Sequence, residues 1–118
     1  MKKSSILFIL LSFFEPNCPW CYRQMKVFNK LDSSCGKHIQ PVVVGINGNA
    51  RALRKELRKA KVGFPALKAS KELKSIFSVP ATPWTLVIDA DGQLLTSIRG
   101  YKPLEDFSDI FKQECHLS

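Results

Sequence analysis

Residues 6–21 read ILFILLSFFEPNCPWC, an apolar run followed closely by two cysteines that are two residues apart. The run is rich in branched and aromatic side chains and ends near Pro16, which is typical of a buried β-strand. Two thiols with this spacing at the start of a helix can form a disulfide, and the helix N-terminus stabilises the first one as a thiolate. The stretch therefore predicts a strand that leads into a helix carrying a reactive pair, Cys18 and Cys21.

The opening of the chain also has features of a secretory signal peptide, because Lys2 and Lys3 precede the apolar run. However, no small-residue cleavage site lies between Phe14 and Cys18, and cleavage there would leave the cysteines without a supporting strand. We therefore interpret residues 1–14 as a strand of the core.

Length and composition predict one domain over residues 1–118, since 45% of the 118 residues are hydrophobic and can form a core without a metal. The net charge of +8 favours acidic partners, nucleic acid or an anionic membrane surface without choosing among them. The longest apolar run is far shorter than the roughly 20 residues of a membrane-spanning helix. We expect a monomer that binds no nucleic acid.

Strand-like and helical patterns alternate along the chain, which indicates an α/β fold. No internal repeat or low-complexity tract interrupts them. The expected strands are 6–14, 41–46, 64–67, 84–89 and 93–99, and the expected helices are 19–32, 49–61 with Asn49 as N-cap, 70–77, and a last one opened by Pro103. The apolar stripes of three helices are Cys21, Met25, Phe28 and Leu31; Ala50, Leu53, Leu57 and Ala60; and Leu104, Phe107, Ile110 and Phe111.

This order of elements, with CxxC after the first strand and Thr82-Pro83 before a β-hairpin, resembles the thioredoxin superfamily over nearly the whole chain. Pro83 in VPATPWTLVIDADG stands where that family has a cis-proline. The resemblance implies a central mixed sheet flanked by helices, with the cysteine pair at the N-terminus of the first helix. The long interval between Cys21 and Pro83, with an added strand and helix near 64–77, is similar to the extracytoplasmic TlpA/ResA branch.

The resemblance implies a protein thiol–disulfide oxidoreductase that needs no cofactor and serves electron transport. Cys18 would attack a substrate disulfide and Cys21 would resolve the mixed disulfide. Pro19 and Trp20 would shape the loop and its docking surface, and a cis bond at Pro83 would leave the Thr82 backbone free to pair with an extended substrate segment. The expected partners are protein thiols or disulfides and a redox partner protein. The branch favours a reductant, which keeps apocytochrome or metal-site thiols reduced, over an oxidant.

Four positions depart from the family pattern. Asn17 stands where a Trp usually precedes the first cysteine, and Ser12 stands where many thioredoxins carry a buried Asp. Gln24 and Lys26 follow the second cysteine, where the branch often has Glu and Pro. The group that handles protons therefore cannot be carried over from the family.

Metal binding is the main alternative to redox chemistry. The spacing of Cys18, Cys21, Cys35 and His38 is that of a zinc finger. The intervening residues are expected to be helical, and at about 1.5 Å per residue they would place Cys35 roughly 20 Å from Cys21, too far to share a zinc ion. We therefore expect no metal site.

Copper binding stays open as a second class of function, because soft thiolates suit Cu(I) and a thioredoxin-like metallochaperone need not be an enzyme. The copper-delivering branch uses CxxxC and a distant His, whereas neither His38 nor His116 falls near the predicted site. Peroxidase activity is not favoured because no Thr stands among residues 13–17, before Cys18. Glutathione binding is a minor option because the chain has no Gly-Gly pair after Pro83, as glutaredoxins have. The basic residues of the second helix are interpreted as a solvated surface: Arg51, Arg54, Lys55, Arg58 and Lys59.

Cys35 and Cys115 follow two helices that, in a thioredoxin-like topology, lie on the same face of the sheet and end at the same pole. A structural disulfide and two unpaired thiols both remain open. A disulfide would favour an oxidising compartment. The resemblance implies an extracytoplasmic location, with a cytoplasmic one also open. It further implies that Met1 follows a removed signal or anchor, through which alone membrane association is expected.

Overall fold

The computed structural model describes residues 6–76 and 78–115. The elements in chain order are β1 (Phe8–Phe14), α1 (Pro19–Cys35), β2 (Ile39–Gly45), α2 (Ala50–Ala60), β3 (Ala66–Lys68), α3 (Lys71–Ile76), β4 (Trp84–Asp89), β5 (Leu94–Arg99) and α4 (Leu104–Ile110). Each expected strand and helix is present, with its ends shifted by up to a few residues.

The strands form one mixed sheet in the order β3-β2-β1-β4-β5. β1 is the central strand and runs parallel to β2 and antiparallel to β4, so Leu10 lies between Pro41 and Val87. β2 is parallel to β3, and β4 and β5 are antiparallel. The predicted fold class, a central mixed sheet flanked by helices, is confirmed.

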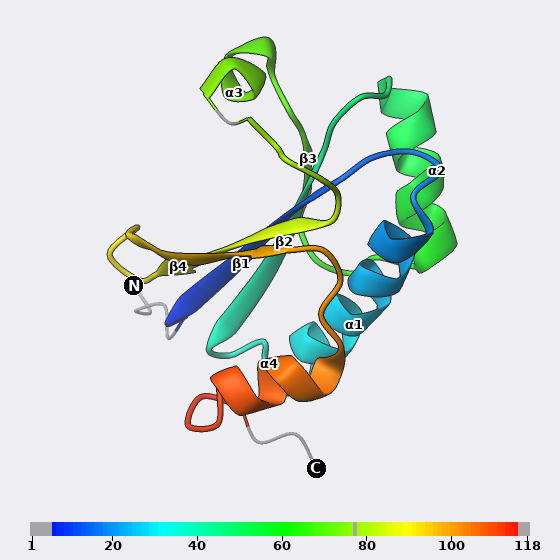
Figure 1. Cartoon of the computed structure of the whole chain (residues 1–118). Helices are drawn as coiled ribbons and strands as arrows, with labels where there is room; N and C mark the ends of the chain where they lie inside the picture. Colours follow the sequence, from blue (N-terminus) through cyan, green and yellow to red (C-terminus); the bar gives the residue numbers. More distant parts are fainter. Residues whose placement is uncertain (1–5, 77, 116–118) are drawn as a thin grey trace, which may run out of the picture.

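Helices cover the two faces of the sheet unequally (Figure 1). α1, α2 and α4 lie on one side, and the short α3 lies on the other. The larger core fills the space under the three helices and includes Leu10, Phe28 and Phe107, each fully buried. A smaller cluster around Phe13 and Leu86 lies on the face of α3. Alternate residues of β1 therefore serve both cores, which explains its continuous apolar sequence.

Proline is unusual inside a parallel sheet because it cannot donate to the hydrogen-bond ladder. Pro41 is tolerated in β2 because β3 is short: β3 pairs only with the segment from Val43 to Gly45. Pro41 is buried nonetheless, and packs in register beside Leu10 of β1.

The predicted apolar stripe holds for α1, and the predicted cap and part of the stripe hold for α2. α1 runs to Cys35, beyond the expected end near Asp32, because Cys35 continues the buried face that Cys21 begins. Asn49 caps α2 as expected, since its Oδ1 accepts a hydrogen bond from the N–H of Ala52 at 2.8 Å. The prediction was wrong for Ala50, which is exposed at the first position of the helix. Glu56, which was not part of the predicted stripe, is buried.

The expected inward position of Ile110 was also wrong, because 51% of its surface is exposed. Phe107 and Phe111, one turn apart, take the inward face of α4 and its end instead. Phe107 packs against Phe28 of α1 with ring centroids 5.7 Å apart, and Phe111 packs against Phe8 at 5.1 Å. Ile110 is the last residue of the helix.

No helix within residues 6–76 and 78–115 is both long enough and apolar enough to cross a lipid bilayer.

Candidate active site

The connection from β1 to α1 brings the cysteine pair to the end of the central strand. β1 ends at Phe14, and Asn17 then adopts a left-handed backbone conformation with φ of +60°. Asparagine tolerates this region better than most residues because its short polar side chain can bond locally. Asn17, which departs from the family pattern, therefore has a local role in turning the chain into the helix.

Cys18 is the N-cap of α1, and Pro19 is its first helical residue. The Sγ of Cys18 accepts a hydrogen bond from the N–H of Cys21 at 3.2 Å. The two cysteines form a disulfide, with their Cα atoms 5.2 Å apart. Only 1% of Cys21 is exposed, whereas Cys18 is partly exposed. An incoming sulfur can therefore reach Cys18 but not Cys21.

The segment before β4 lies directly against Cys18. The Sγ of Cys18 is 3.8 Å from the carbonyl oxygen of Thr82 and 3.8 Å from its Oγ1. The Thr82–Pro83 peptide bond is cis. β4 is the neighbour of β1 in the sheet, so residues 64 positions apart in the sequence meet at one end of these two strands. The structure thus brings together the two motifs that the sequence singled out.

Glu15 also belongs to this site, although the sequence analysis gave it no role. The Oγ1 of Thr82 donates a hydrogen bond to the Oε2 of Glu15 at 2.6 Å. Glu15 is partly buried in the connection between β1 and α1. An acidic residue so close to an apolar strand and a cysteine pair was a signal that could have identified it.

A groove of about 350 Å³ opens beside the disulfide and is lined by Trp20, Thr82, Pro83, Gly100 and Tyr101. Trp20 is 52% exposed, and its ring centroid lies 5.4 Å from that of Tyr101. The guanidinium of Arg23 lies over the same indole, 4.7 Å from its centre, and makes a cation–π contact with it. Trp20 is therefore held between two partners while a large apolar surface remains free.

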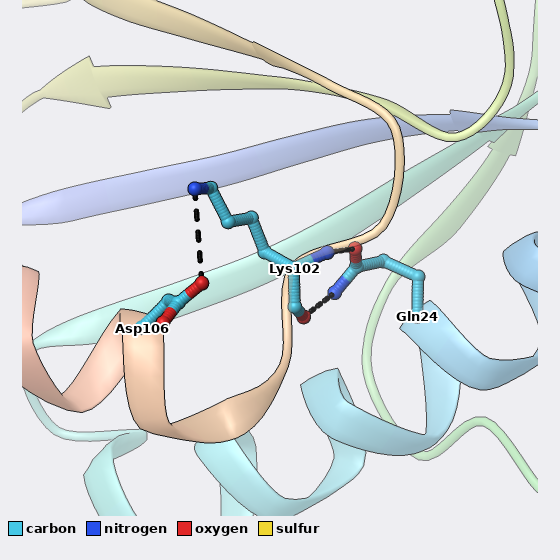
Figure 2. A network of polar contacts seen from close by, with 3 residues as sticks. All are labelled: Gln24, Lys102 and Asp106. Carbon is cyan, nitrogen blue, oxygen red and sulfur yellow. Dashed lines mark hydrogen bonds and ion pairs between the residues drawn. The ribbon is translucent and has the colours of Figure 1, made fainter.

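The loop that carries Tyr101 is fastened to α1 by Gln24 (Figure 2). The Nε2 of Gln24 donates to the carbonyl oxygen of Lys102 at 3.0 Å, and its Oε1 accepts from the Lys102 N–H at 2.8 Å. Gln24 is 1% exposed. The ion pair from Lys102 to Asp106, at 3.7 Å, is half-exposed and contributes little. Gln24 therefore fixes one wall of the groove against the helix of the cysteines.

On the neighbouring strands β1 and β4, Ser12 and Thr85 form a buried pair of hydroxyls. The Oγ1 of Thr85 donates to the Oγ of Ser12 at 3.0 Å, and the two residues face each other across β1 and β4. Ser12 lies on the same face of β1 as Leu10 and Phe14, which belong to the core that contains Cys21. A neutral pair thus occupies the place where many thioredoxins carry a carboxylate.

Cys35 and Cys115 form a second disulfide, with Cα atoms 5.2 Å apart. The bond lies at the far end of α1, and the N–H of His38 bonds to the carbonyl oxygen of Cys35 at 3.0 Å. The residues with zinc-finger spacing are therefore divided between the two ends of α1. His116 lies outside the described residues.

The basic residues of α2 follow the expected solvated surface, since all five are exposed. One of them also has a local contact: the Nζ of Lys59 lies 5.3 Å from the centre of the Tyr22 ring on α1. Another cavity, about 370 Å³ in volume, lies on the opposite face of the sheet beside α3 and is lined by residues such as Leu73 and Val79. It contains neither cysteine of the pair, so we do not assign the redox chemistry to it.

Residues 2–114 match the family model described as a thioredoxin-like domain. The chain belongs to the thioredoxin-like family. No curated protein matches this thioredoxin-like chain significantly.

Solved structures share its fold at low sequence identity. StoA from Bacillus subtilis is 19% identical with a TM-score of 0.74, and the match covers 92% of this chain and 83% of StoA. A thiol:disulfide interchange protein of the thioredoxin family from Chlorobium tepidum is 19% identical, with a TM-score of 0.76 and coverage of 94% and 81%. A secreted disulfide oxidoreductase from Mycobacterium tuberculosis, homologous to E. coli DsbE, is 18% identical, with a TM-score of 0.74 and coverage of 87% and 78%.

Proposed function

We propose that this thioredoxin-like chain exchanges disulfides with protein substrates through Cys18 and Cys21. The observation that carries the proposal is the asymmetry of the pair: Cys18 is reachable at the N-terminus of α1, whereas Cys21 is buried behind it. A helix N-terminus stabilises the thiolate, which is the nucleophile in exchange. Cys18 is therefore the attacking residue and Cys21 the resolving one.

The reduced pair would act in two steps. The Cys18 thiolate attacks one sulfur of a substrate disulfide, so a mixed disulfide forms and the other substrate sulfur leaves as a thiolate that takes up a proton. Cys21 then loses its proton and attacks Cys18, which releases the first substrate sulfur as a thiolate that is protonated in turn. The substrate gains two electrons, and the protein is left with the Cys18–Cys21 disulfide.

The groove beside Cys18 supports a protein substrate. Trp20 and Tyr101 offer an apolar surface next to the reacting sulfur, and aromatic side chains at such positions commonly dominate binding. Thr82 precedes β4 and is partly exposed, so an extended segment could pair with its backbone. Substrate recognition is thus assigned to Trp20, Thr82, Pro83 and Tyr101.

We propose further that the chain acts outside the cytoplasm and is a reductant there. The Cys35–Cys115 disulfide supports the location, because structural disulfides are rare in the cytosol. One protein of the same fold is secreted, and another is a thiol:disulfide interchange protein. A physiological partner that returns electrons to the Cys18–Cys21 pair is part of this proposal.

Reduction of insulin by dithiothreitol tests the activity, because its B chain precipitates when the disulfides are broken. The wild-type chain should accelerate precipitation, and a Cys18→Ser variant should not. Copper analysis of protein purified without oxygen tests the metallochaperone alternative on the same sample. Stoichiometric copper together with no insulin reduction would overturn the proposal and favour metal delivery.

A further inference from the structure

Thr82 presents two oxygen atoms to the sulfur of Cys18. Its carbonyl oxygen and its Oγ1 each lie 3.8 Å from the Sγ. A carbonyl oxygen can only accept a hydrogen bond, whereas a hydroxyl can either donate or accept. The direction of the Thr82 hydroxyl therefore decides whether its Oγ1 acts as a hydrogen-bond donor or as an acceptor toward the sulfur of Cys18.

Glu15 fixes that direction. Its Oε2 accepts the hydroxyl hydrogen of Thr82 at 2.6 Å, a length typical of a hydrogen bond between a hydroxyl and a carboxylate. A hydroxyl has a single hydrogen, so the Thr82 oxygen can offer only a lone pair to Cys18 while this bond is made. Both oxygens of Thr82 then act as acceptors toward the sulfur.

Acceptors favour the protonated form of Cys18 once the disulfide is reduced. A thiol can donate its hydrogen to either oxygen of Thr82, whereas a thiolate would face two acceptors and the nearby carboxylate of Glu15. The opposite influence comes from α1, where the N–H of Cys21 points at the same sulfur from 3.2 Å. The balance between thiol and thiolate is therefore set by two competing sides of the site.

We infer that Glu15 is a positioning residue that acts through Thr82 to destabilise the Cys18 thiolate and so makes the Cys18–Cys21 couple more reducing. The link to redox direction is thermodynamic, because stabilising the Cys18 thiolate stabilises the reduced pair and makes its couple a stronger oxidant. Glu15 works against that stabilisation. The inference rests on the proposed function and names a residue that favours its reducing direction.

The equilibrium with glutathione measures this effect on the couple itself. Two glutathione molecules reduce the Cys18–Cys21 disulfide to two thiols and become one glutathione disulfide, so electrons and protons balance. In a Glu15→Ala variant the Thr82 hydroxyl is free to donate to the thiolate. We expect the constant for reduction by glutathione to rise roughly tenfold, which corresponds to a potential about 30 mV higher. Mass spectrometry of the alkylated Cys18–Cys21 peptide keeps the second disulfide out of the measurement.

Glu15→Gln is the conservative variant, because its amide oxygen can still accept from Thr82 while the charge is lost. Its equilibrium constant should lie between those of the wild type and Glu15→Ala. The rate of alkylation of Cys18 by iodoacetamide at neutral pH should follow the same order, since only the thiolate reacts.

A double-mutant cycle with Thr82→Val separates the route through the hydroxyl from a direct effect of charge. Valine has nearly the shape of threonine and no hydroxyl, so Glu15→Ala should have little further effect on the equilibrium in this background. A full effect of Glu15→Ala without the hydroxyl would overturn the role of Thr82. A Glu15→Ala variant that loses stability but keeps the wild-type equilibrium constant would show a merely structural bond and overturn the inference.

These results are distinguishable from a failure of the proposed function, because glutathione equilibrates with the dithiol whether or not a protein substrate binds. An unchanged constant in Glu15→Ala, with insulin reduction intact in the wild type, contradicts the inference alone. If Glu15→Ala raises the constant as expected but the wild type reduces no protein disulfide, the proposed function alone is contradicted.

Discussion

The side chain of Gln24 pairs with both backbone polar groups of Lys102, across 78 positions of sequence. This bond pair holds the loop with Tyr101 against the helix that begins beside Cys18. Gln24 stands where the resemblance to the TlpA/ResA branch led us to expect an acidic residue. An amide suits this position because it can donate and accept at once, whereas a carboxylate can only accept.

Gln24→Leu should lower the free energy of unfolding by about 2 kcal/mol, because it leaves the two backbone groups of Lys102 without their partner. Gln24→Glu should also destabilise the protein, since a carboxylate would face the carbonyl oxygen of Lys102. Denaturation in urea measures both. Lys26→Ala, an exposed change on the same helix, is the control and should stay within about 0.5 kcal/mol of the wild type. Unchanged stability of Gln24→Leu would contradict this account of the loop.

The Cys35–Cys115 disulfide should be the main covalent contribution to stability. It joins residues 80 apart in the sequence, and a Cys35→Ala, Cys115→Ala variant should lose on the order of 4 kcal/mol by the chain-entropy model. Insulin reduction should persist, because this disulfide and the Cys18–Cys21 pair lie at opposite ends of α1.

A Cys18→Ala, Cys21→Ala variant is the matched control for that measurement. Cys18 and Cys21 are only 3 positions apart, so their disulfide removes little entropy from the unfolded chain. The variant without them should therefore lose much less free energy of unfolding. Equal losses in the two variants, measured by denaturation in guanidinium chloride, would contradict the structural role of the Cys35–Cys115 bond.

Trp20→Ala should slow the turnover of protein substrates and leave the redox equilibrium of the Cys18–Cys21 pair nearly unchanged. Removal of an exposed aromatic anchor beside the reacting sulfur should lower kcat/KM for insulin roughly tenfold. The equilibrium constant with glutathione should change little, because the indole makes no hydrogen bond to either cysteine among the described residues. Leu94→Ala removes an equally exposed apolar side chain outside the groove and serves as the control. Similar kinetics for the two variants would remove Trp20 from the docking surface.

Local patterns predicted the elements well, because each rested on chemistry within a few residues. The apolar run of β1 and the cap at Asn49 are of this kind. The errors at Ala50 and Ile110 arose at helix ends, where an apolar stripe continues in the sequence but the packing partner does not. Periodicity gives the face of a residue but cannot show how far a neighbouring element extends.

The site was predictable only where a motif marked it. The CxxC spacing and the family position of Pro83 placed two segments together, and the structure brings Cys18 within 3.8 Å of Thr82. The partnership of Glu15 with Thr82 spans 67 positions and follows from the pairing of β1 with β4, which no local pattern reports. Whether Cys35 and Cys115 meet likewise depended on the relative placement of two helices.

The roles of Cys18 and Cys21 are tested most directly by trapping of mixed disulfides with a protein substrate. Cys21→Ser keeps the reachable nucleophile but lacks the thiol that resolves it, so it should accumulate a covalent complex with insulin that dithiothreitol releases. Cys18→Ser should form none and should lose turnover. Non-reducing electrophoresis with mass spectrometry of the linked peptides identifies the cysteine involved. A complex linked through Cys21 in Cys18→Ser, with none in Cys21→Ser, would contradict the account.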